Sequence, residues 1–489
     1  MSYEQGRLTK NTTYYTTALV IQKILSFFYF VLIARMIGVT DAGKYIFALS
    51  FTTIFSVFVD FGLTPILIRE IAKDKGKTHR YLSNIVSLKI ILGLVVWAIV
   101  ILLVNLLGYP PITKTLVYLA GLVMVLDSLS LSFYGVLRGY QNLKYESIGT
   151  IIYEVIVVTL GIVALVLKAP LVILILVFVV ASSFNFCYSL TLLYRKKLAR
   201  IKFSLDRHIL KALLIIALPF AIAGIFNRVY SYIDTILLSI LAGDKFVGWY
   251  GVAYKLTFAL QFIPAAFAAS LYPAFSGYFV TSREHLVKTF ERAFNYLMIV
   301  AIPIACGTII LADKIILKLY GLEYSPSILP LQILMGSLIF IFLNYPVGSL
   351  LNACNRQIIN TINMGIAMVI NVLLNILLIP YFTFIGASIA SLSSATILFF
   401  LGFIWTNRII KFNKFLMFKN FLKPLFAGLA MGSTILYLKP QISFLILIPL
   451  GVFIYFIILY LLRGFTKEDI KVFYKSIFVS TRTKNKANS

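Results

Sequence analysis

Long runs of apolar residues, separated by short polar breaks, follow one another along nearly the whole chain. A helix that crosses the hydrocarbon core of a bilayer needs about 20 mostly apolar residues, and most of these runs are long enough. Because 61% of the 489 residues are hydrophobic and only 12% are charged, little sequence remains for a domain in water. Lipid offers the backbone no hydrogen-bond partners, so runs of this length favour α-helices. The sequence therefore predicts an all-α polytopic membrane protein.

The polar breaks divide the chain into about fourteen predicted transmembrane helices. The spans are expected near residues 13–37, 43–63, 81–107, 115–137, 147–168, 170–194, 209–240, 247–277, 288–311, 326–350, 358–380, 384–407, 420–438 and 442–462. Two of the divisions depend on proline: Pro170 separates the fifth span from the sixth, and Pro440 separates the last two. The first apolar run is long enough to span a membrane, so a cleaved signal peptide is not expected.

Lysine and arginine are unevenly divided between the two sides of this arrangement. About three quarters of the 44 basic residues fall in the amino terminus, the even-numbered breaks and the tail. Cytoplasmic loops retain positive charge, so both termini are expected to be cytoplasmic. The same distribution explains the net charge of +27, because cations at membrane edges contact anionic lipid headgroups. Membrane lipids are therefore expected partners, and nucleic acid is not.

An internal repeat divides the chain further. Gly38, Gly43, Tyr45 and Ala48 follow the first predicted span, and the same residue types with the same spacing follow the seventh, beginning at Gly243. The offset is about 205 residues, and a weaker match at Gly135 and Gly348 has an offset of about 213. One alternative is that this glycine pattern reflects helix-end chemistry alone. Two similar offsets instead favour a duplication of six spans.

Six is an even number, so both halves enter the membrane in the same sense and form a parallel repeat. The predicted divisions are an N-terminal six-helix lobe at 1–194, a cytoplasmic linker at 195–208, a C-terminal six-helix lobe at 209–407, two extra helices at 408–463, and a basic cytoplasmic tail at 464–489. Repeated halves of this kind place a substrate cavity between them.

Two neighbouring motifs resemble the amino-terminal signature of a known family. The motifs are Leu32-x2-Arg35-x2-Gly38-x4-Gly43-x-Tyr45-x2-Ala48 and Asp60-Phe-Gly-Leu63-x5-Arg69-x-Ile71-Ala72. They resemble the polysaccharide-biosynthesis flippases of the multidrug/oligosaccharidyl-lipid/polysaccharide exporter superfamily. The resemblance implies two six-helix lobes forming a V in the plasma membrane. It also implies alternating-access export of a lipid-linked oligosaccharide on a polyprenyl phosphate or pyrophosphate, with other glycan-assembly membrane proteins as further partners.

Charged residues within the spans indicate where a polar substrate would bind, because each costs about 2.5–3.5 kcal/mol at the centre of the membrane unless a partner or wet cavity receives it. Lys23 shares a helical face with Thr16 and Ser26 on the first span, and Arg228 shares one with Ser231 on the seventh. The first and seventh spans are repeat partners, so their cations are expected to face a common cavity. Basic side chains there would replace part of the hydration of a pyrophosphate.

The candidate cavity residues are Lys23, Arg35, Asp60, Arg228, Asp234 and Lys255. The alternative is that the cations only neutralise Asp60, Asp234 or Glu154. Lys89 and Asp127 are discounted, because residues near span ends can reach the interface. Asn363, Asn371 and Asn375 share a face of the eleventh span, where they would bind sugar hydroxyls or an adjacent helix.

Two other functions stay open at this point. A cation-coupled multidrug antiporter of the same superfamily would resemble this chain, although generally with twelve spans and an acidic site. A membrane glycan polymerase or glycosyltransferase is less favoured, because the three histidines and three cysteines have neither metal nor triad spacing and there is no Gly-rich nucleotide loop. No catalytic residue, metal or cofactor is therefore expected, and coupling to Na+, H+ or the membrane potential is left open.

Overall fold

The computed structural model describes residues 2–465, with side chains described from Tyr14 onward. Within this range every regular element is helical, and thirteen helical segments are long and apolar enough to cross a membrane. The predicted class, an all-α polytopic membrane protein, is confirmed. The predicted tail at 464–489 lies almost entirely outside the described residues.

The helices follow the predicted spans closely. They are α1 (Ser2–Ile37), α2 (Val39–Asp60), α3 (Leu63–Lys73), α4 (Thr78–Leu106), α5 (Pro111–Gly139), α6 (Lys144–Val166), α7 (Leu171–Arg195), α8 (Arg207–Leu241), α9 (Asp244–Leu260), α10 (Phe262–Thr281), α11 (Arg283–Leu319), α12 (Ile328–Ala353), α13 (Gln357–Ile409), α14 (Lys414–Leu438) and α15 (Phe444–Leu461), with short 3-10 turns η1 (Lys75–Lys77) and η2 (Leu322–Ser327). The division at Pro170 is correct, because Pro170 is the residue that precedes α7.

Helix α13 corresponds to two of the predicted spans. Its 53 residues include Thr383, whose φ of 49° and ψ of −127° are not helical. The side-chain amide of Asn371 donates to Ser394 Oγ at 3.2 Å. In a straight helix these residues would be about 35 Å apart, so the chain must reverse between them. Counting the two arms of α13 separately accounts for the difference between thirteen segments and fourteen predicted spans.

The chain divides into two compact units, which are described separately. Unit 1 contains the residues up to Ala259 together with Ile316–Pro330 and Thr361–Ser394, and unit 2 contains Leu260–Ile315, Leu331–Asn360 and the chain from Ala395 onward. The predicted lobes at 1–194 and 209–407 follow the sequence repeat instead, and that assignment stays a prediction. The predicted linker at 195–208 largely coincides with the non-helical segment between α7 and α8.

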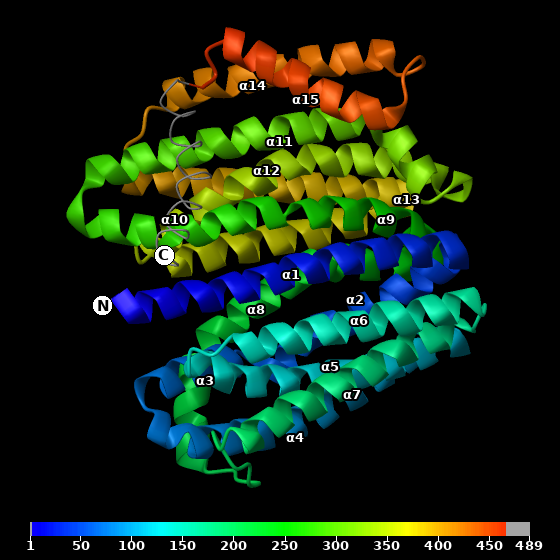
Figure 1. Ribbon diagram of the computed structural model, residues 1–489. Helices are drawn as coiled ribbons and strands as arrows, with labels where there is room; N and C mark the ends of the chain where they lie inside the picture. The colour runs from blue at the N-terminus through cyan, green and yellow to red at the C-terminus, as the bar shows by residue number, and fades with distance from the viewer. Residues whose placement is uncertain (1, 466–489) are drawn as a thin grey trace, which may run out of the picture. The chain divides into compact units, whose positions relative to one another are not determined.

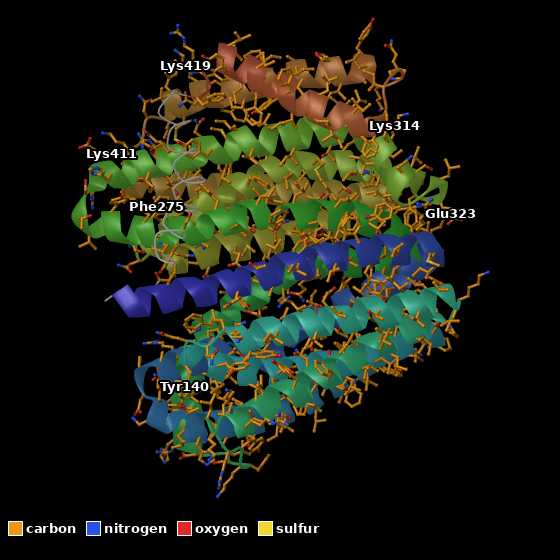
Figure 2. All side chains as sticks on the ribbon, viewed as in Figure 1. Tyr140, Phe275, Lys314, Glu323, Lys411 and Lys419 are labelled. Atoms are coloured by element: carbon orange, nitrogen blue, oxygen red, sulfur yellow. The ribbon has the colours of Figure 1, made fainter. Side chains whose placement is uncertain are left out.

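In unit 1, α1 packs on α6, while α5 packs on α2, α4 and α7 (Figure 1). The turn between α5 and α6, at Tyr140, and η2, at Glu323, lie at opposite ends of this unit (Figure 2). The amino-terminal end of α1 lies at the Tyr140 end. The sequence places the amino terminus and the break between the spans at 115–137 and 147–168 on the same side of the membrane, and which side that is stays a prediction.

Helix α2 ends at Asp60, where the backbone changes direction. Phe61 and Gly62 both have positive φ, 45° and 71°, which breaks the helix and starts α3. Glycine accepts this conformation readily. The amphipathic α3 buries Leu63 and Leu67 against neighbouring helices of unit 1. The break leaves Asp60 at the end of α2 instead of within a continuous helix.

The repeated glycines of the two sequence repeats contact each other. A Cβ atom added to Gly43 would lie 1.8 Å from the Asp244 carbonyl oxygen, and one added to Gly248 would lie 2.1 Å from the Val39 carbonyl oxygen. Each glycine thus allows the start of α2 to approach the start of α9 closely. Gly38 and Gly243, the first residues of the repeated motif, both have positive φ just before these helices.

The register of α2 against its neighbours follows from three further glycines. Gly62 lies against Ala217, and Gly224 lies against Val57, so α2 and α8 are antiparallel. Gly251 lies against Ile46, one turn beyond the Gly43–Gly248 contact, so α2 and α9 run in parallel.

The described residues of unit 2 include two hydrophobic clusters. One lies around Phe290 and Phe399, and the other joins α14 and α15 to α11. Lys439 holds α14 to α11 through Asp313 Oδ1 at 2.6 Å and the Ile310 carbonyl at 2.8 Å. Within this unit, Lys411 and Lys419 lie at one end and Lys314 lies at the other (Figure 2).

Candidate functional site

A cavity of about 690 Å³ lies among seven helices of unit 1. Its walls come from α1, α2, α5, α6, α7, α8 and α9, together with Gly62, which precedes α3, and Pro65 of α3. The glycine contacts described above position three of these helices, because they fix how α8 and α9 lie along α2. Hydroxyl groups and aromatic rings alternate on the walls, so the cavity has both polar and apolar surface.

Five ionisable side chains of opposite sign line the cavity. Arg228 and Lys255 are the cations, and Asp60, Asp127 and Glu154 are the carboxylates. The sequence led us to expect a cavity dominated by positive charge. The lining instead contains more carboxylates than cations, because Asp127 and Glu154 also face it.

Asp60 is held by a buried network at the end of α2. Its Oδ1 accepts hydrogen bonds from Thr64 Oγ1 and from Lys89 Nζ, the latter at 2.6 Å. Lys89 also donates to Thr64 Oγ1 at 2.9 Å and to the Ser128 carbonyl at 3.0 Å. All three ammonium protons therefore have acceptors, and Lys89 is fully buried at 0% exposure.

The sequence interpretation is wrong for Lys89 and Asp127, which it discounts because both lie near span ends. Asp127 lines the cavity, and α4 directs Lys89 inward to the carboxylate of Asp60. The sequence did contain a signal: Asp60 ends one predicted span and Lys89 lies near the start of the next, so both lie at similar depth. A lysine and an aspartate at matched depth form a compensated pair within a membrane.

A second charged group surrounds Glu154 of α6. Lys23 and Lys255 both interact electrostatically with this carboxylate. The Lys255 ammonium lies 5.3 Å from the centre of the Phe30 ring, and that of Lys23 lies 5.5 Å from the centre of the Phe258 ring. Cation–π contacts of this kind partly replace lost hydration. The structure thus brings Lys23 and Lys255 together from α1 and α9, but Lys23 does not line the cavity that it was predicted to share with Arg228.

Arg228 differs from the other cavity cation. Its side chain is exposed and lines the cavity, and within residues 14–465 it has no ion-pair partner. It is therefore the cavity cation most available to a ligand. The alternative that it only neutralises a buried carboxylate receives no support from its contacts.

Asp234 lies outside the cavity in a cage of neutral donors. Tyr250 Oη donates to its Oδ2 at 2.8 Å, Asn375 Nδ2 donates to its Oδ1 at 2.7 Å, and Ser391 Oγ also donates. Asp234 is 3% exposed, and no lysine or arginine of the described residues contacts it. The buried Asn375 Oδ1 has no described partner. These oxygens are the hard ligands that a small cation prefers.

The remaining predicted residues are placed as follows. Arg35 lies exposed in the last turn of α1 and is not among the cavity residues. Asn371 and Asn375 serve helix contacts, since they bind Ser394 and Asp234. Within the described residues no three His, Cys, Asp or Glu side chains cluster as metal ligands.

A polar cavity enclosed by membrane-spanning helices, with an internal repeat, defines this chain as a membrane protein of the transporter class. The chain belongs to the polysaccharide biosynthesis protein family, whose sequence model matches residues 8–279. The resemblance found in the sequence is thus confirmed.

Relatives and solved structures agree with this assignment. The chain is 24% identical over 394 residues to the capsular polysaccharide biosynthesis protein CapF of Staphylococcus aureus, covering 78% of this chain and 95% of CapF. It is 24% identical over 369 residues to the probable low-salt glycan biosynthesis flippase Agl15 of Haloferax volcanii, covering 73% and 75%. The lipid II flippase MurJ, in an inward closed conformation, has a similar fold, with a TM-score of 0.78 at 17% identity over 95% of this chain and 99% of MurJ.

Proposed function

We propose that this protein flips a lipid-linked oligosaccharide, carried on a polyprenyl phosphate or pyrophosphate, from the cytoplasmic to the outer leaflet. The observation that carries this proposal is the cavity lined by Arg228 and Lys255 together with carboxylates and hydroxyls. A charged, hydroxyl-rich headgroup would lose its hydration in crossing about 30 Å of hydrocarbon. A polar cavity inside the helices replaces that hydration.

The cavity suits such a headgroup in size and in chemistry. Its volume of about 690 Å³ lies within the range of sites that enclose small ligands. Arg228 offers a planar, bidentate donor to a phosphate, and Lys255 offers a point charge. Transport by alternating access would require the close contact between the starts of α2 and α9 to open on one side.

The name of one relative supports transport over catalysis, and the name of the other supports the pathway. CapF is named for capsular polysaccharide biosynthesis, and Agl15 is named a probable flippase. Membrane lipids and the lipid-linked saccharide are the partners that this function requires. Other glycan-assembly membrane proteins, cytoplasmic termini and a plasma-membrane location remain part of the proposal.

Asp234 supports a further proposal, that transport is coupled to a cation. A carboxylate buried among neutral donors has its charge uncompensated, and a bound Na+ or H+ would compensate it. We expect Asp234→Asn to abolish the dependence of transport on a Na+ or H+ gradient. If transport by the wild type and by this variant depends equally on the gradient, Asp234 takes no part in the coupling. If the membrane potential alone drives transport, the proposal of a coupling ion is contradicted.

Reconstitution into vesicles tests the function directly. The substrate is a fluorescent polyprenyl pyrophosphate disaccharide, and the readout is its loss from the leaflet accessible to a quencher. We expect Arg228→Ala and Lys255→Ala to lower the initial rate at least about tenfold, as expected for loss of a charged hydrogen bond. Arg35→Ala is the matched control, because Arg35 lies outside the cavity. Wild-type vesicles that move no lipid faster than empty vesicles would contradict the proposal.

A multidrug antiporter is the alternative function, and the carboxylates Asp60, Asp127 and Glu154 are the observation that favours it. Acidic side chains would bind cationic drugs. However, Asp60 is already neutralised by Lys89, and Glu154 lies near Lys23 and Lys255. Export of a cationic dye by the same vesicles, without movement of the lipid, would favour the antiporter.

A further inference from the structure

The carboxylate of Asp60 is bonded by the protein and also lines the cavity. The side chains of Thr64 and Lys89 both donate to its Oδ1, and the backbone N–H of Thr64 also donates to the carboxylate. A carboxylate has about four lone-pair positions, so acceptor capacity remains, and the side chain is 25% exposed while lining the cavity. Asp60 is therefore fixed in position and can still accept a hydrogen bond from a ligand.

A buried hydroxyl without a partner lies next to this carboxylate. Ser128 lines the cavity and is 4% exposed, and its Oγ has no hydrogen-bond partner in the part of the chain described here. Its carbonyl binds Lys89, so the serine is attached to the same network as Asp60. An unpaired buried hydroxyl costs free energy unless a ligand satisfies it. Asp127, the preceding residue, also lines the cavity and forms no ion pair with the described lysines and arginines.

The cations lie further along the cavity. Arg228 is one helical turn beyond Gly224, which lies against Val57, so Arg228 is level with Thr53. By the register of α9, Lys255 is level with about Ser50. Asp60 is therefore about two to three helical turns, roughly 10–15 Å, from the level of the cations. Asp60 and the cations thus occupy different levels of one cavity, while the carboxylate of Glu154 lies near Lys255 at the level of the cations.

Separation of this kind suits a ligand with an anionic end and a hydroxyl-bearing end. Carboxylates repel phosphates but accept hydrogen bonds from hydroxyl groups, whereas cations attract phosphates. We infer that Asp60, Asp127 and Ser128 form a saccharide subsite, in which the carboxylates accept sugar hydroxyl protons, while the phosphate binds at Arg228 and Lys255. Lys89 is a positioning residue that keeps Asp60 charged and oriented. This inference rests on the proposed function.

Binding of two purified lipids to the protein in nanodiscs tests the subsite. The probes are polyprenyl pyrophosphate without sugar and the same lipid with a disaccharide. We expect the wild type to bind the glycosylated lipid more tightly. Asp127→Asn and Ser128→Ala should reduce this preference about tenfold or more without changing the affinity for the bare lipid. Arg228→Gln should weaken binding of both lipids to a similar extent.

The variants of Asp60 need a design of their own, since Asp60→Asn alone leaves the Lys89 charge buried. Asp60→Asn combined with Lys89→Met removes both charges and should lose the sugar preference as Asp127→Asn does. Asp41→Asn is the matched control on α2, because Asp41 lies outside the cavity and pairs with Lys44. It should leave both affinities unchanged.

The possible outcomes distinguish failure of the proposed saccharide subsite from failure of the proposed transport function. A wild type that binds neither lipid contradicts the proposed function. A wild type that binds both lipids equally contradicts the subsite and leaves the function standing. If Asp127→Asn and Ser128→Ala each lose affinity for both lipids while their thermal stability is unchanged, the subsite is also overturned. The two residues would then act on the phosphate end or on the whole cavity.

Discussion

Gly43 provides the sharpest test of how the two sequence repeats pack. An added Cβ would lie 1.8 Å from the Asp244 carbonyl and 3.1 Å from the Gly248 nitrogen. Since non-bonded atoms need at least about 3 Å, Gly43→Ala must displace α2 or α9 by more than about 1 Å. Overpacking of this kind typically costs about 1–3 kcal/mol, and alanine recovers up to about 1 kcal/mol through its higher helix propensity. With the full recovery, we expect a net loss of up to about 2 kcal/mol relative to the wild type, and of about 1–3 kcal/mol relative to a glycine-to-alanine change without a clash.

Unfolding in mixed detergent micelles measures this loss, and fluorescence of Trp249, adjacent to Gly248, reports on the contact itself. The matched control is Gly277→Ala in α10, because a Cβ there would meet no atom within 4 Å. We expect this control to be as stable as the wild type or slightly more stable. The double variant Gly43→Ala and Gly248→Ala should lose less than the sum of the two single variants, since one displacement relieves both clashes. Equal stability of the Gly43 and Gly277 variants would refute the reasoning.

Three further predictions concern charged groups. Lys89→Met should lower the free energy of unfolding by about 3 kcal/mol, since it leaves Asp60 without its cation. In a double-mutant cycle, adding Asp60→Asn should recover part of this loss. If Lys89→Met costs no more stability than the same change at a surface lysine, the pairing is contradicted. Arg80 and two backbone N–H groups hold the pKa of Asp206, in the loop before α8, below its ordinary value. The contribution of Asp206 to stability is therefore present above about pH 4 and is lost as the pH falls through the lowered pKa. Asp206→Asn should accordingly speed hydrogen exchange at the start of α8 at pH 6 but not near pH 2. Equal exchange rates of wild type and variant at pH 6 would count against this prediction. Arg138→Lys should destabilise the turn after α5, because lysine cannot make both of the hydrogen bonds that Arg138 donates to the Glu146 carboxylate. Faster proteolysis in this turn is the expected result.

The membrane spans could be predicted from the sequence because the physical constraint on them is one-dimensional. Length, hydrophobicity and proline decide where a helix crosses a bilayer, and these can be counted along the chain. The reversal at Thr383 within α13 falls between the spans predicted at 358–380 and 384–407, so the sequence separates the two arms correctly. The repeat was visible as well, because Gly43 and Gly248 are needed where two backbones approach closely.

The site was less predictable, because it depends on which residues of distant segments face one another. The sequence indicated Asp60, Arg228 and Lys255 as cavity residues, and all three line it. It did not indicate that Lys89 is the partner of Asp60, since the choice between a lysine that reaches the interface and one that points inward depends on the rotation of α4. The placement of Asp234 in a cage outside the cavity depends in the same way on the arm of α13 that supplies Asn375.

The contact between Gly43 and Gly248 has a consequence for how the two halves can diverge in sequence. Each glycine is the counterpart of the other, so the starts of α2 and α9 present the same patch twice, as subunits do in an isologous dimer interface. A side chain gained in one half must find its space in the other half. This pair is therefore constrained jointly, because neither glycine has a side chain to give up when its counterpart gains one.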